Sequence, residues 1–435
     1  MKTYAWIQRP VHRLNILMLF LLVCLLVACG STTTPRGSTG GVNTGGQGGN
    51  TPTPATTPAS TATVGSTPVV SGTPGVNGPD CAGQASLLSF RMLDSSHGWA
   101  LNVNAVLKTS DGGKDWTCVT PAGWLNKIGM EARATYLLDG LHAWVVPTPQ
   151  SSNTITVLRT SDGGQTWQST TFSDSLPVVV DPPHFINAQE GWLELVPNGG
   201  PGAGSESADI FHTIDGGQTW MKIASTDNPG SGLPRGGIKT GISFEDSMNS
   251  WATGGDYSNT PWLYVTHDGG STWQKQQLAD YPGSIGTPST NVQYMTTPPV
   301  FFGTTGLLPL QVVGQLDQGP QAAVHGFLLY VTHNGGQSWN TFWKTTPGTL
   351  TSFQTTLQGL YIVDPLHALA VDKNTGTLYR TSDGGQSWHQ IASVGLVTSM
   401  SFVDSQQGWL ISQNGFQRTT NGGNTWRYIP YYYPH

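Results

Sequence analysis

One short motif occurs seven times in this chain of 435 residues and constrains the fold more than any other feature. Each copy has a Thr, an Asp or Asn two positions later, two glycines and then a Trp. The acidic or amide residues are Asp111, Asp162, Asp215, Asp268, Asn334, Asp383 and Asn421. The closing tryptophans are 38 to 66 residues apart, a period that indicates a repeat architecture.

A second motif precedes each copy of the first. It has an apolar residue, often an Asp or Asn two positions on, and then Gly-Trp or a substitute, as at Phe402, Asp404 and Trp409. Together the two motifs predict four strands in each unit, A to D, and such units are propeller blades. We therefore predict an all-β fold, a seven-bladed β-propeller of four-stranded antiparallel blades over residues 80–435. Because the pattern starts with strand A and ends with strand D, we expect the ring to close without strand exchange.

The first motif lies at the turn between strands C and D. An Asp or Asn side chain accepts hydrogen bonds from amides ahead of it, and glycine adopts the positive φ of a tight hairpin. The Thr hydroxyl closes the same turn, and we expect the Trp to cover it. The role predicted for the seven Asp and Asn residues is structural.

The composition agrees with short strands and tight turns. Gly and Pro together make 85 of the residues, and both are unfavourable inside helices. The 16 tryptophans are too many for a disordered chain. The chain has a net charge of −6 and few charged residues. No nucleic-acid partner is expected, because binding phosphates requires a basic face.

The N-terminus predicts export. Lys2, Arg9 and Arg13 precede an apolar stretch that is too short to span a bilayer comfortably. The end of that stretch, Leu-Val-Ala-Cys-Gly, resembles the lipobox of bacterial lipoproteins, which implies a signal peptide over residues 1–28 and a lipid on Cys29. The alternative is a plain signal peptide with an incidental cysteine. Residues 29–79, rich in Gly, Ser, Thr and Pro, predict a flexible lipid-anchored linker.

The two remaining cysteines, Cys81 and Cys118, predict a disulfide. They form an even pair in a chain expected to be exported, a context that favours oxidation. Neither has a histidine at metal-ligand spacing, so no metal site is expected there.

The turn motif is identified as the Asp-box, or BNR repeat, of sialidases, sortilin-type receptors and some glucanases. With the Asp-x-x-x-Gly-Trp motif, residues 84–433 most resemble the seven-bladed propellers of the photosystem II stability and assembly factor family. This resemblance implies a non-catalytic role in assembling a membrane protein complex. The long stalk is also typical of a cell-surface receptor.

Long connections at the other end of the blades predict a binding face there. The B–C connections include residues 147–154, 196–208, 253–261 and 314–326, and the D–A connections include 121–134, 172–183, 225–240, 277–299 and 344–358. Loops on a rigid scaffold commonly carry function. The candidate contacts are Trp124, Lys127, Glu131, Arg133, Asp181, Arg235, Lys239, Asp256, Tyr257, Trp262, Asp280, Tyr281 and His325. Taken singly, each of them is better explained as an ordinary solvated loop residue than as a contact, and only the group as a whole indicates a binding face.

An enzyme is the minority interpretation. Sialidases, by resemblance, clamp a carboxylate with three arginines, but Arg159, Arg380 and Arg418 occupy a repeated position just before the Asp-box. We expect no catalytic residues, no metal and no cofactor, and we expect a monomer anchored at the outer face of the bacterial cytoplasmic membrane. The expected partner, on the binding face formed by the long connections, is a protein complex or a glycan. The alternative function is a glycoside hydrolase or carbohydrate-binding protein.

Overall fold

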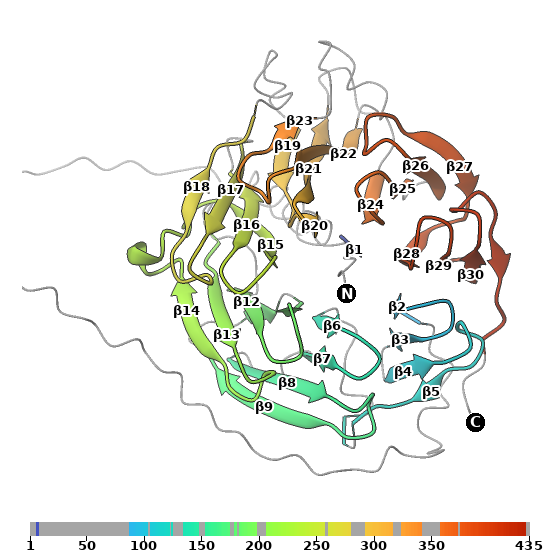
Figure 1. The fold of residues 1–435 in the computed structure, drawn as a ribbon, viewed down its shortest axis with the longest axis horizontal. Helices are drawn as coiled ribbons and strands as arrows, with labels where there is room; N and C mark the ends of the chain where they lie inside the picture. Colours follow the sequence, from blue (N-terminus) through green and yellow to red (C-terminus); the bar gives the residue numbers. More distant parts are fainter. Residues whose placement is uncertain are drawn as a thin grey trace, which may run out of the picture.

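The protein is a ring of seven antiparallel β-sheets around a central axis (Figure 1). The computed structural model describes residues 6–7, 87–102, 105–121, 123–124, 134–147, 153–174, 178–180, 182–197, 206–256, 260–279, 292–315, 323–341, 357–372 and 375–431. Each blade is one sheet whose strands follow one another along the chain, except that a short N-terminal strand also joins the sheet of blade 6. The predicted all-β, seven-bladed propeller is confirmed.

Five blades have an uninterrupted inner strand. Blade 1 contains β2 (Ser89–Met92), β3 (Gly98–Leu101), β4 (Val106–Thr109) and β5 (Thr117–Cys118). Blade 2 contains β6 (Thr135–Leu137), β7 (Ala143–Val145), β8 (Thr154–Thr160) and β9 (Gln168–Ser173). Blade 4 contains β15 (Ile238–Phe244), β16 (Ser250–Gly255), β17 (Pro261–Thr266) and β18 (Gln274–Gln276). Blade 6 contains β24 (Leu357–Ile362), β25 (Ala368–Asp372), β26 (Thr377–Thr381) and β27 (His389–Ser393). Blade 7 contains β28 (Val397–Phe402), β29 (Gly408–Ser412), β30 (Gly415–Thr419) and β31 (Arg427–Tyr428).

In blades 3 and 5 the inner strand is split in two. Blade 3 contains β10 (Val178–Val180), β11 (His184–Phe185), β12 (Gly191–Pro197), β13 (Asp209–Thr213) and β14 (Met221–Ser225). Blade 5 contains β19 (Val292–Thr296), β20 (Val300–Phe302), β21 (Thr305–Gln315), β22 (Ala323–Thr332) and β23 (Asn340–Thr341). A Pro-Pro pair lies at each break, at residues 182–183 and 298–299, and proline has no N–H to donate to the ladder.

One predicted connection is shorter than expected. In blade 5, β21 and β22 stay paired as far as Gln315 and Ala323, so the loop expected over residues 314–326 is wrong in its bounds. The apolar run in β21 extends the ladder beyond the point where the repeat pattern places its end. A short strand, β1 (Trp6–Ile7), lies at the centre of the ring and pairs with β24 (Figure 1).

Helix is nearly absent from the described residues, which contain one short 3₁₀ turn, η2 (Pro229–Ser231). None of their helices has the length and apolar character needed to cross a membrane.

The ring closes between blades 7 and 1 without strand exchange, as predicted, because all four strands of each blade are consecutive. Trp409 Nε1 in blade 7 donates to the carbonyl of Gly112 in blade 1 at 3.0 Å. The backbone N–H of Met92 donates to Ser401 Oγ at 3.0 Å, which joins the two inner strands.

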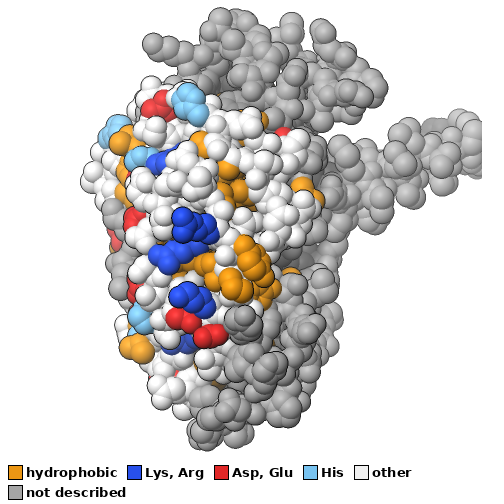
Figure 2. Space-filling model, turned by 90° about the vertical axis from the view of Figure 1, so that its right-hand side faces the viewer, with side chains coloured by type: hydrophobic (Ala, Val, Ile, Leu, Met, Phe, Trp, Pro, Cys, Tyr) orange, Lys and Arg blue, Asp and Glu red, His pale blue; other side chains and the backbone are white. Residues whose placement is uncertain are grey.

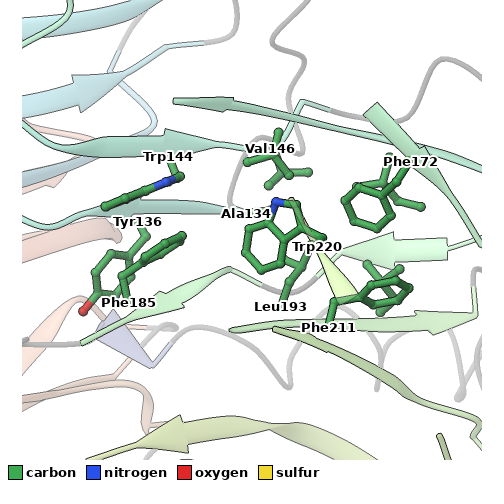
Figure 3. Packing of buried hydrophobic residues seen from close by; sticks show 12 residues of the cluster. Ala134, Tyr136, Trp144, Val146, Phe172, Phe185, Leu193, Phe211 and Trp220 are labelled. Carbon is green, nitrogen blue, oxygen red and sulfur yellow. The ribbon is translucent and has the colours of Figure 1, made fainter. Parts of the chain in front are cut away.

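The core lies between neighbouring blades, where aromatic side chains interleave. Figure 3 shows one such layer between blades 2 and 3, in which Trp144 lies face to face with Phe185. The ring centroids of Trp144 and Phe185 are 3.6 Å apart, and Trp192 and Phe244 repeat this stack between blades 3 and 4 at the same distance. At these two junctions the Gly-Trp tryptophan packs on the apolar residue that ends strand A of the next blade, which explains why the second motif contains both.

Candidate functional site

The two ends of the blades have different chemistry. We call the end formed by the A–B and C–D turns the Asp-box face, and the end formed by the B–C and D–A connections the long-loop face. In the edge-on view of Figure 2, most of the acidic and histidine side chains that are visible among the described residues lie toward the left.

The Asp-box turns are closed by hydrogen bonds between side chains and backbone. In blade 2, Thr160 Oγ1 donates to Asp162 Oδ1 at 2.8 Å and accepts from the Gly164 N–H at 2.9 Å. Thr166 donates to the same carboxylate through its N–H and its hydroxyl. Partial burial acts to raise the pKa of Asp162, but the hydrogen bonds from Thr166 and Thr160 outweigh it and hold that pKa below its ordinary value. Gly163 and Gly164 both have positive φ, as this hairpin requires.

Cations just before the boxes connect neighbouring blades. Lys108 Nζ donates to the carbonyl of Gly140 in the next blade at 2.9 Å. Arg380 donates to the carbonyls of Gly422 and Ser405, also in the next blade, at 3.3 and 3.2 Å. The repeated cation noted in the sequence therefore has a structural role where these contacts occur.

Two histidines beside the Asp-boxes, His267 and His333, and one cysteine, Cys118, lie among the described residues. His267 Nδ1 lies 2.7 Å from Asn249 Oδ1, and His333 Nδ1 lies 3.4 Å from Thr305 Oγ1. Among the described residues, no three His, Cys, Asp or Glu side chains are grouped to hold a metal ion. Cys118 is disulfide-bonded, while Cys81 and Cys29 lie outside the described residues.

The predicted contacts on the long-loop face differ in where the structure places them. Lys127, Glu131, Arg133, Asp181, Tyr257, Asp280 and Tyr281 lie outside the described residues. Arg235 is exposed and pairs with Asp227 at 3.2 Å, and His325 lies in β22 opposite Val313. Trp124 is half-buried beside the core between blades 1 and 2.

The other three are engaged in the fold. Asp256 Oδ1 accepts from the N–H of Thr260 and so caps the B–C turn of blade 4. Lys239 and Trp262 are buried, each 5% exposed, where the sequence suggested solvated loop residues. The Trp262 indole packs edge to face on Tyr264. The prediction that any of these residues contacts a ligand stays a prediction.

Lys239 belongs to an ionic cluster between blades 3 and 4. Its N–H donates to Glu206 Oε2 at 2.8 Å, and its Nζ donates to the carbonyls of Arg235 and Gly236. Burial lowers the pKa of Lys239 to about 8, although the carboxylates of Glu206 and Glu194 act to raise it.

A second ionic cluster joins blades 2 and 3. Lys222 Nζ donates to Asp174 Oδ1 at 2.6 Å and to Asp209 Oδ2 at 2.9 Å. Burial acts to lower the pKa of Lys222, but hydrogen bonds from its ammonium to both carboxylates outweigh it, so that pKa is raised. Burial also raises the pKa of Asp209, against the opposing effect of Ser225 and Lys222.

Sequence reasoning missed these clusters, although one signal was present. Glu194 is a charged residue inside the apolar second strand of its blade, where a charge is stable only if it has partners. The four carboxylates of the clusters, those of Asp174, Glu194, Glu206 and Asp209, are between 1% and 7% exposed. Glycoside hydrolysis needs two carboxyl groups flanking a bound sugar, so these buried groups fit an ionic contact between blades better than catalysis.

The fold defines the protein as an all-β, seven-bladed propeller of antiparallel sheets. Its residues 82–231, about a third of the chain, match the family described as Photosynthesis system II assembly factor YCF48. This match agrees with the resemblance that the two sequence motifs carry.

Solved structures of low sequence identity are also similar to the chain. YCF48 bound to D1 peptide has 18% identity and a TM-score of 0.47, covering 78% of this chain and 91% of the other. YCF48 from Cyanidioschyzon merolae has 16% identity and a TM-score of 0.42, covering 79% and 97%. The GH74 xyloglucanase from Xanthomonas campestris has 12% identity and a TM-score of 0.33, covering 76% and 69%. No curated protein matches the chain.

Proposed function

We propose that this protein is a non-catalytic scaffold, anchored outside the cytoplasm by a lipid on Cys29, that binds a membrane protein complex through its long-loop face. The observation that carries the proposal is the match of residues 82–231 to the photosystem II assembly factor family. The resemblance of residues 26–30 to a bacterial lipobox and the composition of residues 29–79 support the anchor. A linker of about 50 residues has a root-mean-square reach of roughly 40 Å, enough to hold the propeller clear of a bilayer.

The test of binding is a crosslinking pull-down of the intact chain from its own membranes, with partners identified by mass spectrometry. Arg235→Glu reverses an exposed charge on the long-loop face, and Arg427→Glu is the matched control on an outer strand. We expect one membrane complex to be recovered with the native chain and the control, and lost with Arg235→Glu. Loss with both variants, or with neither, contradicts binding through this face.

If no protein partner is recovered, the scaffold proposal is contradicted and the glycan alternative is favoured. That alternative is measured as the release of reducing sugar from polysaccharides.

The lipid anchor is tested separately. Cys29→Ala is expected to move the protein from the membrane fraction to the soluble fraction, and retention in the membranes contradicts lipidation at this residue.

A further inference from the structure

More than half of the large exposed apolar side chains of the described residues lie on the Asp-box face. Among the described residues seven large hydrophobic side chains are exposed, and four of them lie in turns on this face. They are Leu141 (54%) in blade 2, Ile214 (72%) in blade 3, Met248 (50%) in blade 4 and Leu366 (54%) in blade 6. We call these four residues the apolar tips.

The repeats show that the fold does not require apolar residues at these positions. Leu141, Met248 and Leu366 hold the third position of the A–B turn, where blades 1, 3 and 7 have polar residues. Those residues are Ser96, Gln189 and Gln406. In all six turns the backbone N–H of the third residue donates to the first Asp or Asn, at 2.6 to 2.9 Å. The backbone geometry is the same with either type of side chain, so an exposed Leu or Met adds nothing to this turn.

Ile214 departs from its repeat in the same way. It holds the second position of the Asp-box in blade 3, and the other six boxes have a polar residue there. Those residues are Ser110, Ser161, His267, His333, Ser382 and Thr420. The Thr213 and Asp215 side chains on either side of Ile214 form the usual hydrogen bond at 2.8 Å. A side chain that is 72% exposed gains little burial from folding.

The charge around the apolar tips is strongly negative. The A–B and C–D turns of the described residues contain thirteen carboxylates and a single lysine, Lys114. Four more cations reach this face from the strands before the boxes, namely Lys108, Arg159, Arg380 and Arg418. The excess of carboxylates on this face is larger than the net charge of the whole chain, which is −6. Opposite charge on a partner favours both encounter and orientation here.

We propose that the Asp-box face is a second docking surface, whose occupant is a protein segment that carries cationic and apolar side chains together. The carboxylates attract the cations, and the apolar tips supply contacts that release water on binding. This surface lies at the opposite end of the blades from the long-loop face, so the proposal does not depend on the proposed function.

The test uses two synthetic peptides of equal length and charge as probes, one built from Lys and Leu and the other from Lys and Ser. Their dissociation constants are measured on the immobilised full-length chain at low and moderate ionic strength. We expect the Lys-Leu peptide to bind at least about tenfold more tightly, the effect of burying a few apolar groups. Salt is expected to weaken both, because it screens exposed charges. Equal binding of the two peptides, or binding of neither, overturns the proposal.

Equivalent positions in the other blades also indicate which polar substitutions these turns accept. Leu141→Gln, Met248→Gln and Leu366→Gln copy the glutamine of blades 3 and 7, and Ile214→Ser copies the serine of blade 1. The combined variant is expected to keep its thermal stability and to bind the two peptides within about threefold of each other. Leu396→Ser, an exposed apolar residue between blades 6 and 7 on the long-loop face, is the matched control and is expected to keep the preference. If the combined variant keeps the preference, or the control loses it, the apolar tips are not the docking surface.

Discussion

Single residues in the Asp-box tolerate an exchange of Asp for Asn because the hydrogen bonds of the turn allow it. In all seven boxes the Thr hydroxyl donates to Oδ1 of the Asp or Asn at 2.7 to 3.0 Å. The second oxygen of Asp162 accepts from the Thr166 hydroxyl, whereas Nδ2 of Asn334 donates to Ser338 Oγ at 2.9 Å. A hydroxyl is donor and acceptor in one group, so it satisfies either side chain.

We therefore predict that Asp162→Asn changes the free energy of unfolding by less than about 0.5 kcal/mol, whereas Asp162→Ala lowers it by about 1 to 2 kcal/mol. The alanine leaves the N–H of Thr166 and the hydroxyl of Thr160 without their acceptor. Urea denaturation of the two variants and the native protein measures both values. Equal loss in the two variants would show that the negative charge, and not the hydrogen-bond geometry, stabilises the turn.

At the scale of the elements, the short strand β11 holds a histidine that stays neutral. The ring of His184 packs beside Tyr136 and Phe244, and its Nε2 donates to the carbonyl of Phe244 at 2.8 Å. Burial lowers the pKa of His184 to about 4, although the hydrogen bond to Phe244 acts to raise it. The contact joins the inner strands of blades 3 and 4, so protonation of this one ring strains the junction between two blades.

Because the pKa of His184 is lower in the folded state than the usual 6.5 or so, the unfolded chain binds the proton more readily as the pH falls. The contribution of neutral His184 to the free energy of unfolding is complete above pH 6.5 and is lost as the pH falls toward 4. Between pH 7 and pH 4.5 we predict that this group lowers the free energy of unfolding by about 2.5 kcal/mol. Urea denaturation at pH 7 and pH 4.5 gives the free energy of unfolding of the native protein and of His184→Gln. The decrease between the two pH values should be smaller in His184→Gln by that amount. Parallel pH profiles would contradict the assignment.

Among the structural elements, some are predicted by the sequence and others are not. Turn residues and apolar periodicity fix strand order and the Asp-boxes, because both are local. The splits in blades 3 and 5 follow from Pro-Pro pairs that are visible in the sequence but have no counterpart in the repeat pattern. Lys239 and Trp262 look like loop residues, and their burial depends on how blade 4 packs on its neighbours, which no local pattern contains.

For the whole molecule, the closing junction between blades 7 and 1 is built like the others. Ser401 Oγ accepts from Met92 N–H across that junction at 3.0 Å, and Ser243 Oγ donates to the carbonyl of Pro299 across the junction of blades 4 and 5 at 2.8 Å. Both serines are buried. Trp409 donates to Gly112 at 3.0 Å just as Trp192 donates to Gly269 at 3.1 Å between blades 3 and 4.

A ring closed by equivalent junctions should unfold as one unit, although its two ends are joined by no shared strand. We predict that Ser401→Ala and Ser243→Ala each lower the free energy of unfolding by about 1 to 3 kcal/mol, because each leaves a buried backbone group without its partner. Both variants should keep a single transition when fluorescence and circular dichroism are followed together in urea. Hydrogen exchange provides the local readout, and β2 and β15 should lose protection to similar extents. An early transition confined to blades 1 and 7 in Ser401→Ala alone would show that closure is the weak junction of the propeller.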